Sequence, residues 1–159
     1  MPQGAIVAGR VDGKNWLTMG CREWLPVMAV SQPVLMAAEG VEAPVRFGYW
    51  LGDDAKPVVG KPANVEGNEK KKKEPPRVGW SALPEGCDLY LRMSGLLWPE
   101  AAHRLANSAY LTREPLGRGQ IILFASSPTF RAVTLGQTRL FLNAMIYGPG
   151  FGAAQPIRP

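Results

Sequence analysis

Short runs of apolar residues separated by Gly, Pro and Asp characterise the first third of the chain. Each run is rich in Val and Leu, has the length of a strand and is bounded by turn-forming residues. This pattern predicts four strands, at residues 4–11, 25–31, 34–38 and 43–51.

The second half of the chain alternates between strand-like and helix-like patterns. Residues 87–108 predict a strand that passes through a Ser-Gly turn into a short helix, whose first turn contains Pro99. Residues 134–147 have the strongest helix pattern, because Thr134 and Gln137 have the spacing of a capping box. Four apolar residues also recur there at helical intervals: Leu135, Leu142, Met145 and Ile146. We expect Gly148 and Pro149 to end this helix.

A glycine pair around an arginine, Gly117-Arg118-Gly119, allows two interpretations. A phosphate-binding loop needs its glycines after a strand and at the start of a helix. Here the strand-like residues 108–115 precede the glycines and the apolar run 120–125 follows them. We therefore interpret the glycines as the turn of a hairpin, since glycine readily adopts the positive φ that tight turns require.

Composition agrees with a single folded domain over residues 1–159, because 46% of the residues are hydrophobic. The order strand, helix, strand, strand, helix in the C-terminal half indicates an α/β or α+β fold. No apolar run approaches the roughly 20 residues of a membrane span. The N-terminus also lacks the basic and apolar regions of a signal peptide.

Charge is concentrated in one place. The formal net charge is +5, and Lys70 to Lys73 supply nearly all of it. Residues 52–77 contain few large apolar groups, so we expect an exposed Lys/Pro-rich insertion, and we expect residues 150–159 to form a flexible tail. The lysines could bind nucleic acid, but no aromatic residue lies among them to stack on bases, which favours a solvated loop.

The sequence offers few catalytic residues. Its one histidine, His103, lies on the predicted short helix, and imidazole-based zinc sites usually need two or three histidines. Cys21 precedes a predicted strand, with Arg22 beside it to lower its pKa, whereas Cys87 is followed by Asp88, whose charge would raise its pKa. We interpret both cysteines as structural thiols, and whether they pair stays open. No metal site and no cofactor are predicted.

One loop is more suggestive of binding. Ser126, Ser127, Thr129 and Arg131 follow the apolar strand 120–125 and precede the capped helix. Ligands collect at such carboxyl ends of strands in open α/β sheets. Ser and Thr are also ordinary residues of a turn into a helix, and Arg131 could simply pair with a carboxylate. These four residues are the candidate ligand-binding site.

Residues 94–149 resemble the C-terminal segment of a group of bacterial proteins related to the M14 zinc carboxypeptidases. The pattern comprises Ser-Gly-x-Leu, a short helix, a strand, Leu-Gly-Arg-Gly, an apolar strand with a Pro-x-Phe-Arg loop, and a helix containing Arg-Leu-Phe-Leu-Asn-Ala. In that group a domain similar to class I glutamine amidotransferases follows the peptidase domain. Residues 16–36 also look like the earlier part of this domain.

The resemblance implies a flavodoxin-like, class I glutamine amidotransferase-like sheet with flanking helices. It implies an incomplete copy of that domain, because not all of the domain's N-terminal strands are accounted for in this sequence. The chain lacks the His-x-x-Glu zinc ligands of the peptidase and the Cys and His-x-Glu set of an active amidotransferase. We therefore expect a non-catalytic accessory module of a metallocarboxypeptidase-like hydrolase whose parent family is exported. A cryptic cysteine hydrolase and a nucleic-acid binder acting through Lys70 to Lys73 are the alternatives.

Overall fold

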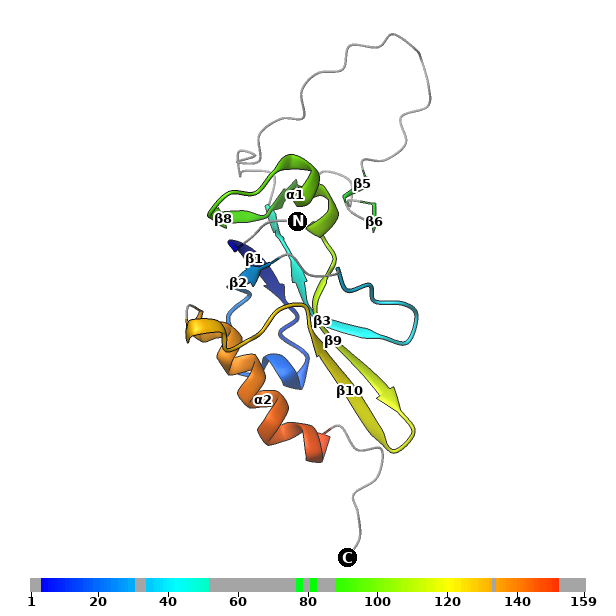
Figure 1. Cartoon of the computed structure of the whole chain (residues 1–159). Coiled ribbons are helices and arrows are strands. Elements are labelled where there is room, and N and C mark those ends of the chain that lie inside the picture. The colour runs from blue at the N-terminus through cyan, green and yellow to red at the C-terminus, as the bar shows by residue number, and fades with distance from the viewer. Residues whose placement is uncertain are drawn as a thin grey trace, which may run out of the picture.

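A curled sheet of antiparallel strands forms the centre of the protein (Figure 1). The computed structural model describes residues 4–30, 34–51, 77–78, 81–82, 88–132 and 134–151. The strands of the main sheet are β1 (Ala5–Val11), β2 (Trp24–Ala29), β3 (Glu42–Phe47), β8 (Arg92–Ser94), β9 (Ala109–Leu116) and β10 (Gly119–Phe124). Their order is β10-β9-β3-β1-β2, with β8 also paired to β1.

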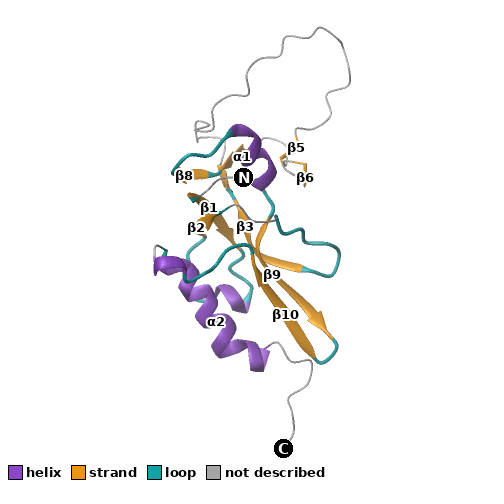
Figure 2. Ribbon diagram, in the orientation of Figure 1, coloured by secondary structure: helices purple, strands orange, loops and turns teal. Residues whose placement is uncertain are grey.

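Two short strand pairs and four helical segments complete the described elements. The pairs are β4 (Tyr49–Leu51) with β7 (Asp88–Tyr90), and β5 (Arg77–Val78) with β6 (Ser81–Ala82). The helical segments are η1 (Trp16–Thr18), α1 (Pro99–Leu105), η2 (Phe130–Ala132) and α2 (Leu135–Phe151). Figure 2 shows α2 as the longest helix, lying beside the sheet, while α1 lies at the opposite end of the molecule.

The sheet curls because one edge of β1 is shared. β1 pairs with β2 over most of its length, but its other edge pairs with β3 near Val11 and with β8 near Ile6. The chain turns away from β3 at Gly48, which has a φ of 84° and donates its N–H to the Ala8 carbonyl at 2.6 Å. Glycine at this position lets the strand break and continue as β4.

An aromatic chain fills the space between the sheet and α2. Tyr110 of β9 is fully buried, with its ring 5.6 Å from that of Phe47 and 6.2 Å from that of Phe124. Phe124 in turn lies 6.4 Å from Phe141 of α2. These edge-on contacts attach α2 to the end of β10, while Leu140 of α2 is buried in the same core.

The locally encoded elements are confirmed. Residues 4–11 and 25–31 contain β1 and β2, the hairpin β9–β10 turns at Gly117 with a φ of 57°, and the short helix is α1. The prediction for 34–38 is wrong, since only a single bridge joins Leu35 to Ala109. The strand predicted at 43–51 is interrupted at Gly48.

The long helix is confirmed, but its predicted end is wrong. Gly148 and Pro149 lie inside α2, which continues to Phe151. Tertiary contacts hold this last turn: the Gly148 carbonyl accepts a hydrogen bond from Gln120 Nε2 at 2.9 Å, and Phe151 stacks on Trp16 at 6.2 Å. These contacts outweigh the local tendency of Gly and Pro to stop a helix.

The fold class is mixed α/β, as expected, but a flavodoxin-like arrangement is not confirmed. That arrangement requires a mostly parallel sheet. Every pair of strands in the described part of the chain is antiparallel, and the parallel contact there is an isolated bridge between Gly9 and Gly48. The expected insertion at 52–77 lies outside the described residues except for Arg77, and the expected tail at 150–159 lies outside them beyond Phe151.

Candidate functional site

The loop predicted to bind a ligand connects β10 to α2, and its residues point in different directions. Ser126 is buried, and its Oγ donates to the Met28 carbonyl at 2.7 Å, which ties the end of β10 to β2. Ser127, Thr129 and Arg131 are exposed. Arg131 has a φ of 48°, and its guanidinium lies 5.2 Å from the centre of the Phe130 ring.

The four candidate residues share one loop, in which Ser126 is buried and the other three are exposed. Among the described side chains, no hydrogen bond joins Arg131 to Ser126, Ser127 or Thr129. The serine that is buried acts as an anchor, because its hydroxyl is already occupied by a main-chain carbonyl. An anion site at Ser127, Thr129 and Arg131 stays a prediction.

A cleft of about 330 Å³ lies nearby, between the connection from η1 to β2 and the first turns of α2. Its floor is apolar and is formed by Trp24, Leu25 and Pro26. Its rim carries Cys21 and two arginines, Arg22 from the connection and Arg139 from α2. The cleft thus combines an apolar floor with two positive charges.

Two glycines allow the walls of the cleft to approach each other. Gly20 has a φ of 76°, and a Cβ there would lie 2.7 Å from Nη2 of Arg139, so glycine leaves room for the guanidinium. A Cβ added at Gly136 would lie 3.3 Å from Cβ of Leu25. The absence of a side chain at Gly136 therefore lets α2 lie close to β2. The cleft could not be predicted from the sequence, because Arg22 and Arg139 are distant in sequence and neither belongs to a motif.

A buried amide fixes the connection to the helix. Asn143 of α2 donates from Nδ2 to the carbonyls of Leu17 and Met19, both at 2.9 Å. Arg139 adds a longer bond from Nε to the Met19 carbonyl at 3.4 Å. The cleft is therefore held in shape by side chains of α2 that bind main-chain oxygens.

The thiol of Cys21 is free and only partly accessible. Burial raises its pKa above the usual value of 9.0, and the nearby charge of Arg139 acts in the opposite direction. From the sequence we expected Arg22 to lower this pKa, but in the structure the charge that does so is that of Arg139. Cys87 lies outside the described residues, and His103 is exposed on α1.

We expect Cys21 to react slowly with thiol reagents at neutral pH. The reactive form is the thiolate, and a raised pKa leaves little of it at pH 7. In a Cys87→Ser background, the rate of iodoacetamide labelling should still be rising at pH 9. Arg139→Gln should shift the profile further upward, because the cation that favours the thiolate is removed. A labelling midpoint near pH 7 would contradict this expectation.

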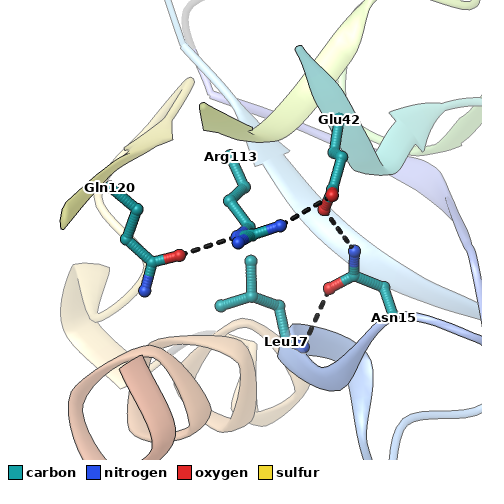
Figure 3. A network of polar contacts seen from close by, with 5 residues as sticks. All are labelled: Asn15, Leu17, Glu42, Arg113 and Gln120. Carbon is teal, nitrogen blue, oxygen red and sulfur yellow. Dashed lines mark hydrogen bonds and ion pairs between the residues drawn. The ribbon is translucent and has the colours of Figure 1, made fainter. Parts of the chain in front are cut away.

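A polar network on the other side of η1 joins four separate elements (Figure 3). Arg113 of β9 donates from Nη1 to Glu42 at 2.6 Å and from Nε to Gln120 at 2.7 Å. Glu42 also accepts from Asn15 Nδ2 at 2.9 Å, and the Asn15 oxygen caps η1 by accepting from the Leu17 N–H at 3.0 Å. The four bonds drawn in Figure 3 tie β9, β10 and β3 to the start of η1, so we interpret this network as structural.

A second pair of arginines lies across the sheet. Arg10 of β1 and Arg46 of β3 are directly paired in register, and both are partly buried. Burial and the neighbouring charge of Arg46 lower the pKa of Arg10 to about 10. Asn107 receives hydrogen bonds from both, at 2.7 Å from Arg10 and 3.1 Å from Arg46. No pattern in the sequence predicts this pairing.

No family model, curated protein or solved structure matches the chain. Within the residues that the structure covers, no three His, Cys, Asp or Glu side chains are grouped as a metal site would require. In the same residues, no helix has the length and apolarity needed to cross a membrane. The cleft and the surface of α2 are therefore interpreted from their own geometry.

Proposed function

We propose that this chain is a non-catalytic interaction module that docks onto a hydrolase polypeptide through the outer face of α2. The hydrolase class, an M14 zinc carboxypeptidase-like protein, comes from the resemblance of residues 94–149. The docking surface comes from the structure. The proposal does not depend on a flavodoxin-like ancestry.

The supporting observation is that α2 buries polar side chains beside Leu140 and exposes several large apolar ones. Its most buried side chains include Gln137, 1% exposed, and Asn143, 2% exposed. Its solvent side carries apolar residues that recur at helical intervals: Leu135, Leu142, Met145 and Ile146. A surface helix ordinarily places charged and polar residues outward. Arg139 is the sole charged residue in α2, so the helix lacks the row of charged residues that a solvent-exposed face ordinarily carries.

An apolar patch of this kind is typical of a surface that another protein covers. Burying a single Leu or Ile side chain of the patch contributes about 1.5–3 kcal/mol. The four residues named above therefore supply enough apolar surface for the centre of an interface, with polar groups around it.

Charge favours a different protein over a second copy of this chain as the occupant. Arg139 lies on α2 itself, Arg22 lies beside it in the cleft, and Arg131 precedes the helix. A second copy would bring the same cations to the interface, whereas a partner with acidic groups at its rim would complement them. We therefore assign the outer face of α2 to a hydrolase domain with an acidic rim. The loop around Arg131 adds the exposed ring of Phe130 to the same contact.

The test is association of the full chain with a purified M14 zinc carboxypeptidase-like domain. Ile146→Glu places a charge on the docking face and should weaken association at least tenfold, because the charge would have to be buried against an apolar partner. Leu96→Glu is the matched control, since Leu96 is 66% exposed and Ile146 is 65% exposed. Leu96 lies away from α2, so its substitution should leave association unchanged.

Analytical ultracentrifugation of the mixed and separate proteins distinguishes the outcomes. Two results would contradict the proposal. One is an equal loss of association for both variants. The other is no association of the unsubstituted chain at about 50 μM, a concentration at which even modest interfaces are populated. Self-association that Ile146→Glu abolishes would show that the occupant is a second copy and would also overturn it.

A further inference from the structure

We propose that the cleft between the η1–β2 connection and α2 binds a small carboxylate that carries an apolar group. The ligand's apolar part would lie on Trp24, Leu25 and Pro26, and its carboxylate would lie between Arg22 and Arg139. This inference goes beyond the docking function and does not rest on it, because Trp24, Leu25 and Pro26 are separate from the apolar residues of the docking face, although Arg22 and Arg139 would also face the rim of a docked partner.

The size and floor of the cleft suit a small organic molecule. Its volume of about 330 Å³ falls at the lower end of the range for small-molecule sites. Leu25 and Trp24 both line the cleft, and Leu25 is buried whereas Trp24 is 42% exposed. A ligand that covers these groups removes apolar surface from water on both sides of the contact.

The two arginines supply the charge recognition. Arg139 makes one hydrogen bond within the described residues, the long bond to the Met19 carbonyl, and has no carboxylate partner there. Arg22 likewise has no carboxylate partner in the described part of the chain. Since a guanidinium carries five N–H donors in a planar fork, most of those on Arg139 stay available to a carboxylate. The Cys21 thiol is uncharged at neutral pH because its pKa is raised, so it does not neutralise the arginines.

A carboxylate fits this cleft better than phosphate does. Phosphate is more strongly hydrated and has no apolar part to cover Trp24 and Leu25, so much of the floor would stay wet. A carboxylate carries one charge, and its two oxygens match the guanidinium fork. An apolar carboxylate satisfies both the floor and the rim.

The site is also formed before a ligand arrives. Asn143 holds the connection through two main-chain carbonyls, and Gly20 keeps Arg139 close to it. A rigid site of this kind loses less conformational entropy on binding. A single apolar carboxylate should therefore bind with a dissociation constant on the order of 1 mM, typical of a small fragment with few contacts.

The test measures protection of Cys21 in the full chain carrying Cys87→Ser. The probes are phenylacetate, its neutral analogue phenylacetamide, and inorganic phosphate, each at about 10 mM, well above the expected dissociation constant. The readout is the rate of iodoacetamide labelling at pH 8.5, followed by intact mass. Phenylacetate should slow labelling about threefold or more, whereas phenylacetamide and phosphate should change it little, because each lacks one half of the recognised chemistry.

Two arginine substitutions locate the effect. Arg139→Gln should abolish protection by phenylacetate. Each labelling rate is divided by the rate of the same variant without probe, so a change in the pKa of the Cys21 thiol does not affect the comparison. Arg118→Gln, on the exposed hairpin turn, is the matched control and should retain protection. If Arg139→Gln fails to fold, the contrast between phenylacetate and phenylacetamide decides alone.

Three results would overturn the inference: no protection by phenylacetate, equal protection by phenylacetamide, or equal protection by phosphate. The Ile146→Glu protein should still be protected by phenylacetate, since Ile146 does not line the cleft. The docking function and the carboxylate site can therefore fail independently.

Discussion

Gly48→Ala is expected to destabilise the protein by about 3 kcal/mol, from positive-φ strain and overpacking together. The φ of 84° at this residue is one that side-chain-bearing residues rarely adopt. An added Cβ would also lie 2.6 Å from Cγ and Cδ2 of Leu89, which is buried and cannot swing into solvent. Urea unfolding of the purified chain measures the loss, and the transition slope should stay unchanged.

Gly40→Ala is the matched control. Gly40 has the same φ of 84°, but an added Cβ would meet nothing within 4 Å. This substitution isolates the backbone cost, which should be about 1 kcal/mol. Equal losses at the two positions would show that the contact with Leu89 does not limit the structure, contrary to the packing described above.

Asn143→Asp is expected to cost about 3–5 kcal/mol at pH 7, the range measured for uncompensated buried charges. The substitution replaces the Nδ2 donor by an oxygen that faces the Leu17 and Met19 carbonyls. The new carboxylate would then be buried against two acceptors, and Arg139, which reaches the same Met19 carbonyl through one long bond, would offset only part of the cost. Asn143→Ala removes the same two hydrogen bonds without adding a charge, and about 2 kcal/mol is expected for it.

The pH dependence separates the two variants. Burial and the two carbonyls should raise the pKa of the introduced carboxyl in the folded state above its unfolded value of about 3.9. A raised folded pKa means that the folded state binds the proton more tightly, so acidification stabilises the Asn143→Asp protein relative to Asn143→Ala. Thermal melts between pH 7 and pH 4.5 should show the gap closing, and a constant gap would contradict the buried geometry.

Elements whose signals are local could be predicted from the sequence. The hairpin at Gly117, the short helix at Pro99 and the start of α2 near Thr134 each follow from a turn or cap residue next to a periodic pattern. The break at Gly48 and the extension of α2 through Pro149 could not be predicted. They depend on Ala8, Gln120 and Trp16, which lie far away in sequence.

The orientation of α2 shows why periodicity alone is insufficient. Leu135, Leu142, Met145 and Ile146 form a stripe that would ordinarily mark a buried face. In the structure this stripe faces outward, and Asn143 faces inward. One reason is that the Leu17 and Met19 carbonyls face the helix and need a hydrogen-bond donor, which the Asn143 amide supplies.

The candidate site was found from the sequence only in part. The loop from Ser126 to Arg131 was located correctly between β10 and α2, but its serine hydroxyl turned out to be a structural anchor. The cleft was missed because Arg22 and Arg139 meet only after α2 packs against β2. Side chains that converge through tertiary packing leave no spacing in the sequence.

The pairing of β4 with β7 has a consequence for how this gene can change. The two strands pair Leu51 with Asp88, so these two residues, far apart in sequence, lie next to each other. Each doubling of the length between these residues would cost only about 0.6 kcal/mol of closure entropy. Insertions, deletions and duplications at this position therefore need not shift the register of any other strand, and this is where lineages carrying this fold should differ most in length.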